Sequence, residues 1–259
     1  MAKLIWGDVG RRFYEAGVDR GVLFIDSFGY PWNGLTAVSE APSGGTPTPL
    51  YLDGIKYLNL TSAEEYEATI NAISSPPEFN VCDGSSTLYM GLSITQQPRK
   101  SFSFSYRTKL GNDVDGLDHG YKIHLVYNAM AAPSSQNNAS LSATAAPVIF
   151  SWKVTTIPVI SMGYKPSAHY VIDTSKVPAE LIIAIEDILY GTGASPARLP
   201  VPEELFALFE PYGPLVIKSL PNGAYSATGH QVLIATPASF TIDDSAVMDN
   251  GDGSFTITY

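Results

Sequence analysis

One acidic, glycine-bounded segment holds the residues of this chain that are best suited to chemistry. Between Gly111 and Gly120 the sequence reads GNDVDGLDHG, with carboxylates at alternate positions and a histidine near the end. Alternating carboxylates followed by glycine are how an EF-hand calcium loop begins. If Gly116 takes the invariant glycine position, however, the first ligand position falls on Gly111 and the twelfth on Lys122. The spacing therefore predicts a solvated loop without a metal, in which Asn, Asp and Gly satisfy local backbone groups.

The other patterns that catalysis requires are also missing from the sequence. The histidines come without a GxSxG nucleophile elbow, and no P-loop is present. His124 falls on the polar face of an expected strand, so we expect it at the surface or in an interface. We expect Cys82, the single cysteine, to be a small buried hydrophobe. We therefore predict that the chain is not an enzyme and uses no cofactor; a hydrolase whose cleft unites a histidine with a serine or carboxylate stays an alternative.

Composition describes a folded, acidic protein. Hydrophobic residues make up 45% of the chain and charged residues only 15%, which excludes wholesale disorder. Fifteen basic residues against 25 acidic ones give a net charge of −10. This charge disfavours nucleic-acid binding, which requires a basic surface. The N-terminus lacks an apolar signal-peptide core, and no apolar run approaches the ~20 residues that span a bilayer. We expect a protein that folds in the cytosol and does not enter a membrane.

The acidic segment lies between two alternating strands that form a long hairpin over residues 102–130. In the first strand Phe102, Phe104 and Tyr106 share one face, and Arg107 points to the other. The second strand alternates in the same way. The ten-residue connection is longer than the turns that usually close hairpins, and long ordered loops are often functional. We expect the hairpin to reach toward a metal, a substrate or another protein chain.

The rest of the chain reads as short strands with few helices. Strands are predicted at residues 21–25, 49–52, 87–94, 146–160 and 169–174. A capping box at Ser62 and Glu65 predicts a helix over residues 63–73. Two further helices are predicted at 178–190, which starts on proline and ends at glycine, and from Pro202. The fold class is mainly β, with helices packed on the strands.

The segment from about Tyr212 onward changes character. It holds the short apolar runs PLVIKSL, HQVLIAT, ASFTID and SFTITY, separated by the turn signals PNG and NGDG. This pattern predicts a small β appendage. We therefore divide the chain into a main domain over residues 1–210 and an appendage over residues 211–259.

Seven segments, in order along the chain, resemble a known family. They are RRFYEAGVDRGVLFI, PWNGLTAVSEAPSGG, YLDGIKYLNLTSAEEYEATI, PPEFNVCDG, RTKLGNDVDGLDHGYKIHLVYNAMAAPS, FSWKVTTIPV and IDTSKVPAELIIAIEDILYG. Together they resemble the major tail protein, the tail tube subunit, of long non-contractile-tailed bacteriophages, notably those that infect actinobacteria. The resemblance covers roughly residues 4–208, and the segment from about Tyr212 lies outside it.

The resemblance implies a structural virion protein with a β-sandwich or barrel core and one or two flanking helices. Such subunits form hexameric rings that stack into a hollow tube, whose inner barrel is built from strands of every subunit. The implied partners are further copies of the chain, other tail proteins, and the tape measure protein and genomic DNA in the lumen, without specific DNA binding. The implied location is the virion tail, after assembly in the host cytoplasm. An acidic lumen would let DNA slide without sticking.

Within this hypothesis the hairpin over residues 102–130 joins a sheet between subunits, and its loop touches the adjacent ring. The residues assigned to that contact are Asn112, Asp113, Asp115, Asp118 and His119. A second contact is assigned to Trp32 and Asn33, because an aromatic beside a tight turn suits an interface anchor. The alternatives are an ordinary core hairpin for the first and a buried core tryptophan for the second.

Another class of protein also fits the sequence. A carbohydrate-binding β-sandwich would explain the 15 tyrosines, 11 phenylalanines and three tryptophans. The appendage has two interpretations as well: a module that decorates the tube and binds a host surface or carbohydrate, or an arm that completes a neighbouring subunit.

Overall fold

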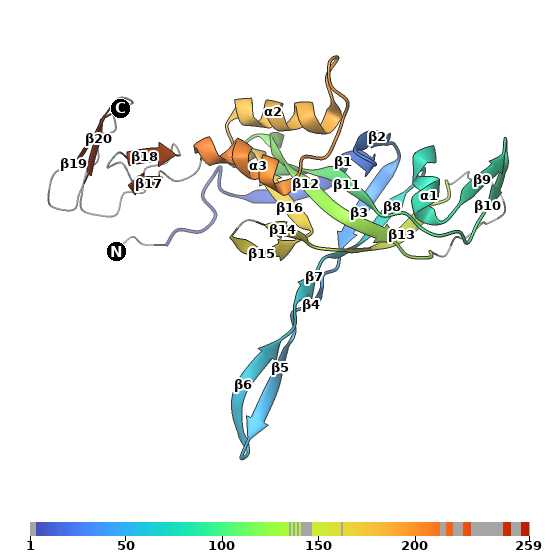
Figure 1. Cartoon of the computed structure of the whole chain (residues 1–259), viewed down its shortest axis with the longest axis horizontal. Coiled ribbons are helices and arrows are strands. Elements are labelled where there is room, and N and C mark those ends of the chain that lie inside the picture. The colour runs from blue at the N-terminus through green and yellow to red at the C-terminus, as the bar shows by residue number, and fades with distance from the viewer. Residues whose placement is uncertain are drawn as a thin grey trace. The chain divides into compact units, whose positions relative to one another are not determined.

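Antiparallel strands dominate the computed structural model of this protein (Figure 1). It describes residues 4–134, 136, 138, 140, 147–161 and 163–212, together with the strands 216–219, 225–228, 246–249 and 255–258. The chain divides into two compact units, Met1–Pro200 and Val201–Tyr259. Within the described parts of the chain, no helix has the length and apolar character needed to cross a membrane. The prediction of a mainly β fold is confirmed.

The first unit is built on an eight-stranded sheet in the order β2-β1-β11-β12-β13-β8-β3, with β16 also paired to β12. Its strands are β1 (Phe13–Ile25), β2 (Phe28–Trp32), β3 (Leu35–Glu40), β8 (Glu67–Ala72), β11 (Phe102–Asn112), β12 (Gly116–Ala131), β13 (Phe150–Thr156) and β16 (His169–Asp173). One edge of β12 pairs with β11. The other edge pairs with β16 over residues 122–126 and with β13 over residues 129–131, so the sheet forks at this strand.

One face of the sheet encloses the main core. Trp32 of β2, the first strand in the order, meets Ile70 of β8, the last strand but one, in this core, so the sheet curls around a single interior. A short helical segment, η1 (Pro77–Phe79) followed by α1 (Asn80–Asp83), inserts Phe79 and Cys82 into this core. The prediction of a buried Cys82 is confirmed. Burial raises the pKa of its thiol to about 12, which leaves it unreactive at neutral pH.

Helix α2 (Ala179–Tyr190) covers the opposite face of the sheet (Figure 1). Its buried residues Leu181, Ile185 and Leu189 recur every four positions and form one apolar stripe. On β12 the residues Ile123 and Leu125 are fully buried outside the main core. The predicted helix over 178–190 is therefore confirmed, and the central strands are covered on both faces, one by the core and the other by α2.

The connection between β11 and β12 is shorter than predicted. Strand pairing continues to Asn112 and resumes at Gly116, so three residues rather than ten separate the strands. The Asn112 side chain makes this turn possible, because its Oδ1 accepts from the backbone N–H of Val114 at 3.0 Å and of Asp115 at 2.5 Å. The glycines flanking the turn thus belong to the strands, where a register shift accommodates them.

The helix predicted over residues 63–73 is wrong. This segment forms β7 (Glu64–Glu65) and β8, and β8 lies between β13 and β3 in the sheet. Burial alternates strictly along β8, with Ala68, Ile70 and Ala72 inside. The period of two was present in the sequence, but the capping-box residues before it favoured a helix; pairing on both edges of β8 decides for the strand.

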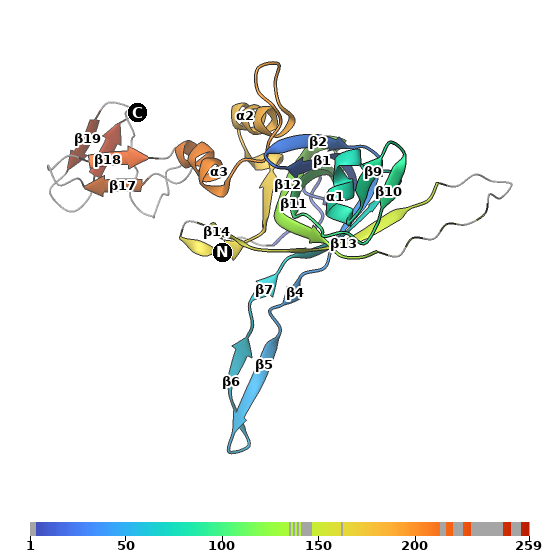
Figure 2. The same ribbon diagram turned by 45° about the vertical axis from the view of Figure 1, so that its right-hand side comes forward.

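One hairpin, which we call the arm, extends away from the main sheet in both views (Figures 1 and 2). It consists of β5 (Pro47–Leu52) and β6 (Ile55–Thr61), and the two-residue strands β4 (Ser43–Gly44) and β7 connect it to the sheet. Two smaller hairpins are formed by β9 (Ser86–Tyr89) with β10 (Leu92–Ile94) and by β14 (Val159–Ser161) with β15 (Tyr164–Ser167). These hairpins account for the strands predicted at 49–52 and 87–94 and for the end of the run predicted at 146–160.

The second unit contains α3 (Pro202–Phe209), which confirms the helix predicted from Pro202, and a 3-10 turn at Glu210–Tyr212. Beyond it, β17 (Val216–Ser219) pairs with β18 (Tyr225–Thr228), and β19 (Ala246–Asp249) pairs with β20 (Phe255–Thr258). The first and last of the four predicted strands coincide with β17 and β20. The predicted strands HQVLIAT and ASFTID and the NGDG turn lie outside the described residues.

Candidate functional site

The residues expected to contact an adjacent subunit ring lie at the turn between β11 and β12, which we call the tip, and they form a local hydrogen-bonded turn there. The Asn112 side chain donates to Asp115 Oδ2 at 2.9 Å, and His119 Nδ1 lies 3.1 Å from the same oxygen. The His119 hydrogen bond lowers the pKa of Asp115. Asp113 Oδ1 accepts from the backbone N–H of Gly10 at 3.0 Å, which ties the N-terminal segment to the tip. Asn112 is buried, and Asp115 and Asp118 are exposed, whereas the Asp113 side chain is only 20% exposed.

Trp32 belongs to the core, which was the alternative interpretation of this residue. Only 4% of it is exposed; its ring packs against Phe79 and Trp152, and its Nε1 donates to the backbone oxygen of Ser74 at 3.1 Å. The neighbouring Asn33 is exposed. A surface contact at this turn would therefore involve Asn33 and not the indole.

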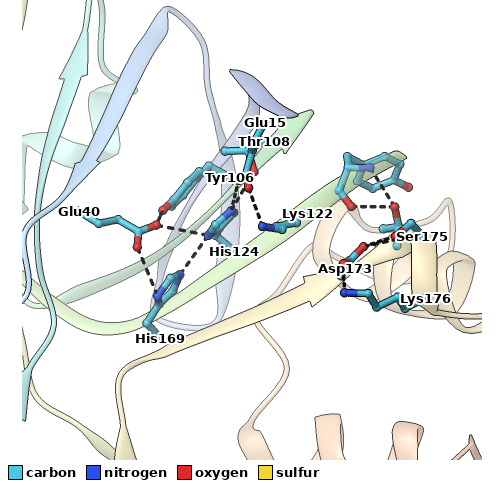
Figure 3. Close-up of polar contacts among 12 residues, drawn as sticks. Glu15, Glu40, Tyr106, Thr108, Lys122, His124, His169, Asp173, Ser175 and Lys176 are labelled. Carbon is cyan, nitrogen blue, oxygen red and sulfur yellow. Dashed lines mark hydrogen bonds and ion pairs between the residues drawn. The ribbon is translucent and has the colours of Figure 1, made fainter. Parts of the chain in front are cut away.

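A second polar cluster was not predicted as a site. Glu40 ends β3, His124 lies in the middle of β12, and His169 begins β16 (Figure 3). The prediction that His124 lies at the surface is wrong: 6% of it is exposed, because β16 pairs across it and the ring of Tyr106 stacks on it with centroids 4.4 Å apart. We call Glu40, His124 and His169 the histidine cluster.

Short contacts link the members of the histidine cluster. His124 Nδ1 lies 3.1 Å from His169 Nε2 and 3.5 Å from Glu40 Oε1. His169 Nδ1 lies 3.9 Å from the other Glu40 oxygen, Oε2. Tyr106 donates its phenolic hydrogen to Glu40 Oε1 at 2.6 Å and so fixes the carboxylate. Three side chains from three different strands thus present imidazole nitrogens and a carboxylate to one another.

The outer side of His124 is held by a hydrogen-bond chain. Its Nε2 lies 3.0 Å from Thr108 Oγ1, and Thr108 donates to Glu15 Oε1 at 2.5 Å. Lys122 donates to the other oxygen of Glu15, also at 2.5 Å (Figure 3). Since the Thr108 hydrogen goes to the carboxylate, its oxygen accepts from His124, which places the single proton of a neutral His124 on Nε2. His124 Nδ1 is then an acceptor, and His169 Nε2–H donates to it.

Burial keeps both histidines neutral. It lowers the pKa of His124, and it lowers the pKa of His169 to about 4, against the opposing attraction of Glu40 for a positive charge. Neutral imidazoles with a nearby carboxylate are metal-ligating groups. Within the described part of the chain, this is also the only group of three or more such side chains whose ligand atoms lie within 4.8 Å of one another.

No short sequence motif predicts this cluster. Its three members are separated by 84 and 45 positions in the chain, and no short motif spans such distances. They meet only because β12 pairs with β16 and because β3 belongs to the same curled sheet. The polarity of His124 on an otherwise apolar strand was a signal, but it was interpreted as surface exposure.

The arm is the third candidate, and it is a surface rather than a pocket. All residues of β5 and β6 are exposed, although alternating strands normally bury one face. Its large exposed hydrophobic residues are Leu50, Tyr51, Leu52, Ile55, Tyr57, Leu58 and Leu60. Neither strand is hydrogen-bonded to a third strand within the described residues. Apolar surface of this size marks an interaction site.

Comparisons with known proteins leave the family undecided. No family model and no curated protein matches the sequence. A chain of the baseplate of the anti-feeding prophage matches with a TM-score of 0.33 and 9% identity, covering 67% of this chain and 100% of that one. A chain of the sheath-tube complex of an extracellular contractile injection system matches with a TM-score of 0.31 and 13% identity, covering 59% and 89%. Both scores are low, and no function is carried over from these assemblies.

Proposed function

We propose that this protein is a structural subunit that assembles with copies of itself into stacked hexameric rings, the tail tube of a long-tailed bacteriophage. The arm supports this proposal most strongly. A two-stranded hairpin is only marginally stable by itself, and this one exposes seven large hydrophobic side chains to water in an isolated monomer. Pairing with a neighbouring subunit would bury these side chains and offset the cost of ordering the arm.

The edges of the main sheet support the same proposal. β2 and β3 end the strand order, and neither pairs with a further strand among the described residues. Gly29 of β2 donates its backbone N–H to the Ala197 oxygen at 2.8 Å, and among the described strands β3 pairs only with β8. Exposed edges are a liability in a monomer, and a closed ring removes them by pairing edges between subunits. The sequence segments that resemble tail tube subunits include β3, which is one of these edge strands, and the arm from Tyr51 onward.

The tube would be the conduit for genomic DNA and the tape measure protein. A net charge of −10 suits a lumen through which a polyanion slides, because repulsion prevents the phosphate contacts on which DNA binding depends. The location proposed for the assembled protein is the virion tail.

Negative-stain electron microscopy across a concentration series, with light scattering in parallel, tests the proposal. Six-fold rings or hollow tubes that increase with protein concentration are the expected result. Monomers at every concentration, both alone and with a tail-tip initiator complex, would contradict it. A thermal shift on a carbohydrate array, together with persistent monomers, would favour the carbohydrate-binding alternative instead.

A further inference from the structure

The histidine cluster has the spacing of a metal-binding site. Zinc binds imidazole nitrogen and carboxylate oxygen at about 2.0–2.2 Å, so two ligand atoms of one tetrahedral ion lie about 3.3 Å apart. In the cluster, His124 Nδ1 lies 3.1 Å from His169 Nε2 and 3.5 Å from Glu40 Oε1, and the three ligand atoms lie within 4.8 Å of one another. We propose that Glu40, His124 and His169 bind one Zn²⁺-class transition-metal ion.

The direction of the ring nitrogens shows how the two histidines must reorient to bind an ion. The ring centroids of His124 and His169 are 5.3 Å apart, and the rings are inclined by only 12°. His124 Nδ1 and His169 Nε2 are only 3.1 Å apart, so both nitrogens lie close to the line that joins the two ring centres. In this position they share a hydrogen bond. Because the two nitrogens point at each other along this line, both rings must turn away from it before their lone pairs converge on a tetrahedral metal ion.

Metal binding also moves one proton without releasing it. The hydrogen on His169 Nε2 occupies the ligand position and must leave that nitrogen. The neutral ring can carry it on Nδ1, which faces Glu40 Oε2 at 3.9 Å. A histidine ligand whose second nitrogen donates to a carboxylate is the usual arrangement around protein-bound zinc. Glu40 would ligate through Oε1, while its Oε2 lies 3.9 Å from the nitrogen that receives the proton.

The surrounding residues already hold the ligands in place. His124 Nε2 donates to Thr108, which is bonded to Glu15, and this chain is the outer support that metal-ligating histidines require. Tyr106 stacks on the His124 ring and donates to Glu40, and the ring of Tyr66 lies 4.4 Å from that of His169. All three ligands lie on strands, which position side chains more rigidly than loops do.

The donor set also selects the ion and leaves room for solvent. Two imidazoles favour zinc and its neighbours over Ca²⁺ and Mg²⁺, which prefer oxygen ligands. The Glu40 side chain is 38% exposed, so the cluster opens to water on that side. An ion held by three protein ligands would complete its tetrahedron with a water molecule.

Titration of the chelator-stripped, tag-free full chain with ZnCl₂ in a calorimeter tests the proposal. We expect one ion per chain, a higher melting temperature with zinc, and no comparable binding of Ca²⁺. Glu40→Gln and His169→Gln should each weaken zinc binding at least tenfold. His119→Gln is the matched control, because this histidine lies at the β11–β12 tip outside the cluster and should bind zinc as the wild type does.

A second measurement keeps the test independent of how the variants fold. Co²⁺ added to the wild-type chain should give the strong visible absorption of a tetrahedral site, and excess Zn²⁺ should abolish it. Absence of stoichiometric zinc binding by the folded wild type would overturn the proposal, as would unchanged affinity in both cluster variants. The inference does not depend on the proposed function, since zinc binding is measured on the chain whether or not it assembles.

Discussion

The β11–β12 hairpin and the arm are both long antiparallel hairpins, but the chain covers only one of them. β11 buries six of its 11 residues and β12 seven of its 16, with the core on one face and α2 on the other. Every residue of β5 and β6 is exposed, including seven large hydrophobic ones. Hydrophobic side chains in the first hairpin stabilise the subunit, whereas those in the second are not covered by any described part of the chain.

Removing the apolar character of the arm should have the largest effect and should fall on assembly alone. In the triple variant Leu50→Ser, Tyr57→Ser and Leu60→Ser, we expect a folded subunit with an unchanged melting temperature that forms no tubes, because these side chains contact solvent in the monomer. Electron microscopy and light scattering at equal protein concentration measure the loss.

A single exposed residue on α2 provides the control for this variant. Ile183 is 59% exposed, and Ile183→Ser should leave assembly intact if the arm is the contact surface. Normal tubes from the triple variant would mean that the arm's hydrophobic residues serve another purpose, and the comparison between the two hairpins would then lose its functional meaning.

The same kind of truncation on each hairpin should separate their roles in stability. Phe104 on β11 is 2% exposed within the core, and Phe104→Ala should lower the free energy of unfolding by about 3–5 kcal/mol. Tyr57 on the arm is 67% exposed, and Tyr57→Ala should change it by no more than about 0.5 kcal/mol. Urea denaturation of both variants as unassembled subunits measures the difference; equal losses would contradict it.

Local patterns in the sequence predicted the elements whose signals are local. The strands of the β11–β12 hairpin and α2 follow from alternation and from a proline start with a glycine end. The segment after Ser62 misled the prediction, because a capping box is a local signal whereas β8 is fixed by β13 and β3, which are distant in sequence. The exposure of the arm was likewise invisible, since alternation looks the same whether or not a covering layer exists.

The candidate sites also differ in whether their residues are close together or far apart in the sequence. The residues around Asn112 could be recognised from the sequence as a polar, turn-forming segment. The turn is shorter than predicted because the Asn112 side chain accepts hydrogen bonds from the backbone N–H groups of Val114 and Asp115. The histidine cluster could not be predicted, because Glu40, His124 and His169 are brought together by strand pairing alone. The contact of the tip residues with an adjacent ring stays a prediction.

Arg107 tests how firmly the covered hairpin is bound to its neighbours. Its guanidinium donates to both oxygens of Asp19 at 2.8 and 3.1 Å and to Glu186 of α2 at 3.3 Å, and it lies over the ring of Tyr121. Its side chain is only 12% exposed. Arg107→Ala leaves Asp19 without its bidentate partner. Glu186 keeps the Tyr121 hydroxyl at 2.9 Å and Arg20 at 4.0 Å. The substitution should cost about 2–3 kcal/mol of unfolding free energy.

The lysine variant shows whether geometry or charge matters at this position. Arg107→Lys keeps the charge but loses the planar fork that engages Asp19 through two bonds, so it should recover only part of the stability. Urea denaturation of the three proteins measures the order wild type, Lys, Ala. Full recovery by lysine would mean that the bidentate contact contributes nothing beyond its charge.

The smallest effect we predict is a change in the free energy of unfolding with pH, which occurs only at acidic pH. The hydrogen bonds from Arg107 hold the pKa of the Asp19 carboxyl below its usual value. Because the folded-state pKa lies below that of the unfolded chain, the ionised carboxylate stabilises the fold above the ordinary Asp pKa of about 3.9, and this contribution is lost as pH falls through the lower, folded-state pKa.

Asp19→Asn removes this titration. The difference in unfolding free energy between wild type and Asp19→Asn should be constant near neutral pH and should shrink below about pH 4, because a protonated Asp19 resembles asparagine. Paired urea denaturation series from neutral to acidic pH measure it. A difference that stays the same down to about pH 3 would show that Arg107 engages Asp19 no more in the folded chain than in the unfolded one. The β1–β11 pairing would then depend on its backbone hydrogen bonds and on packing, and not on this ion pair.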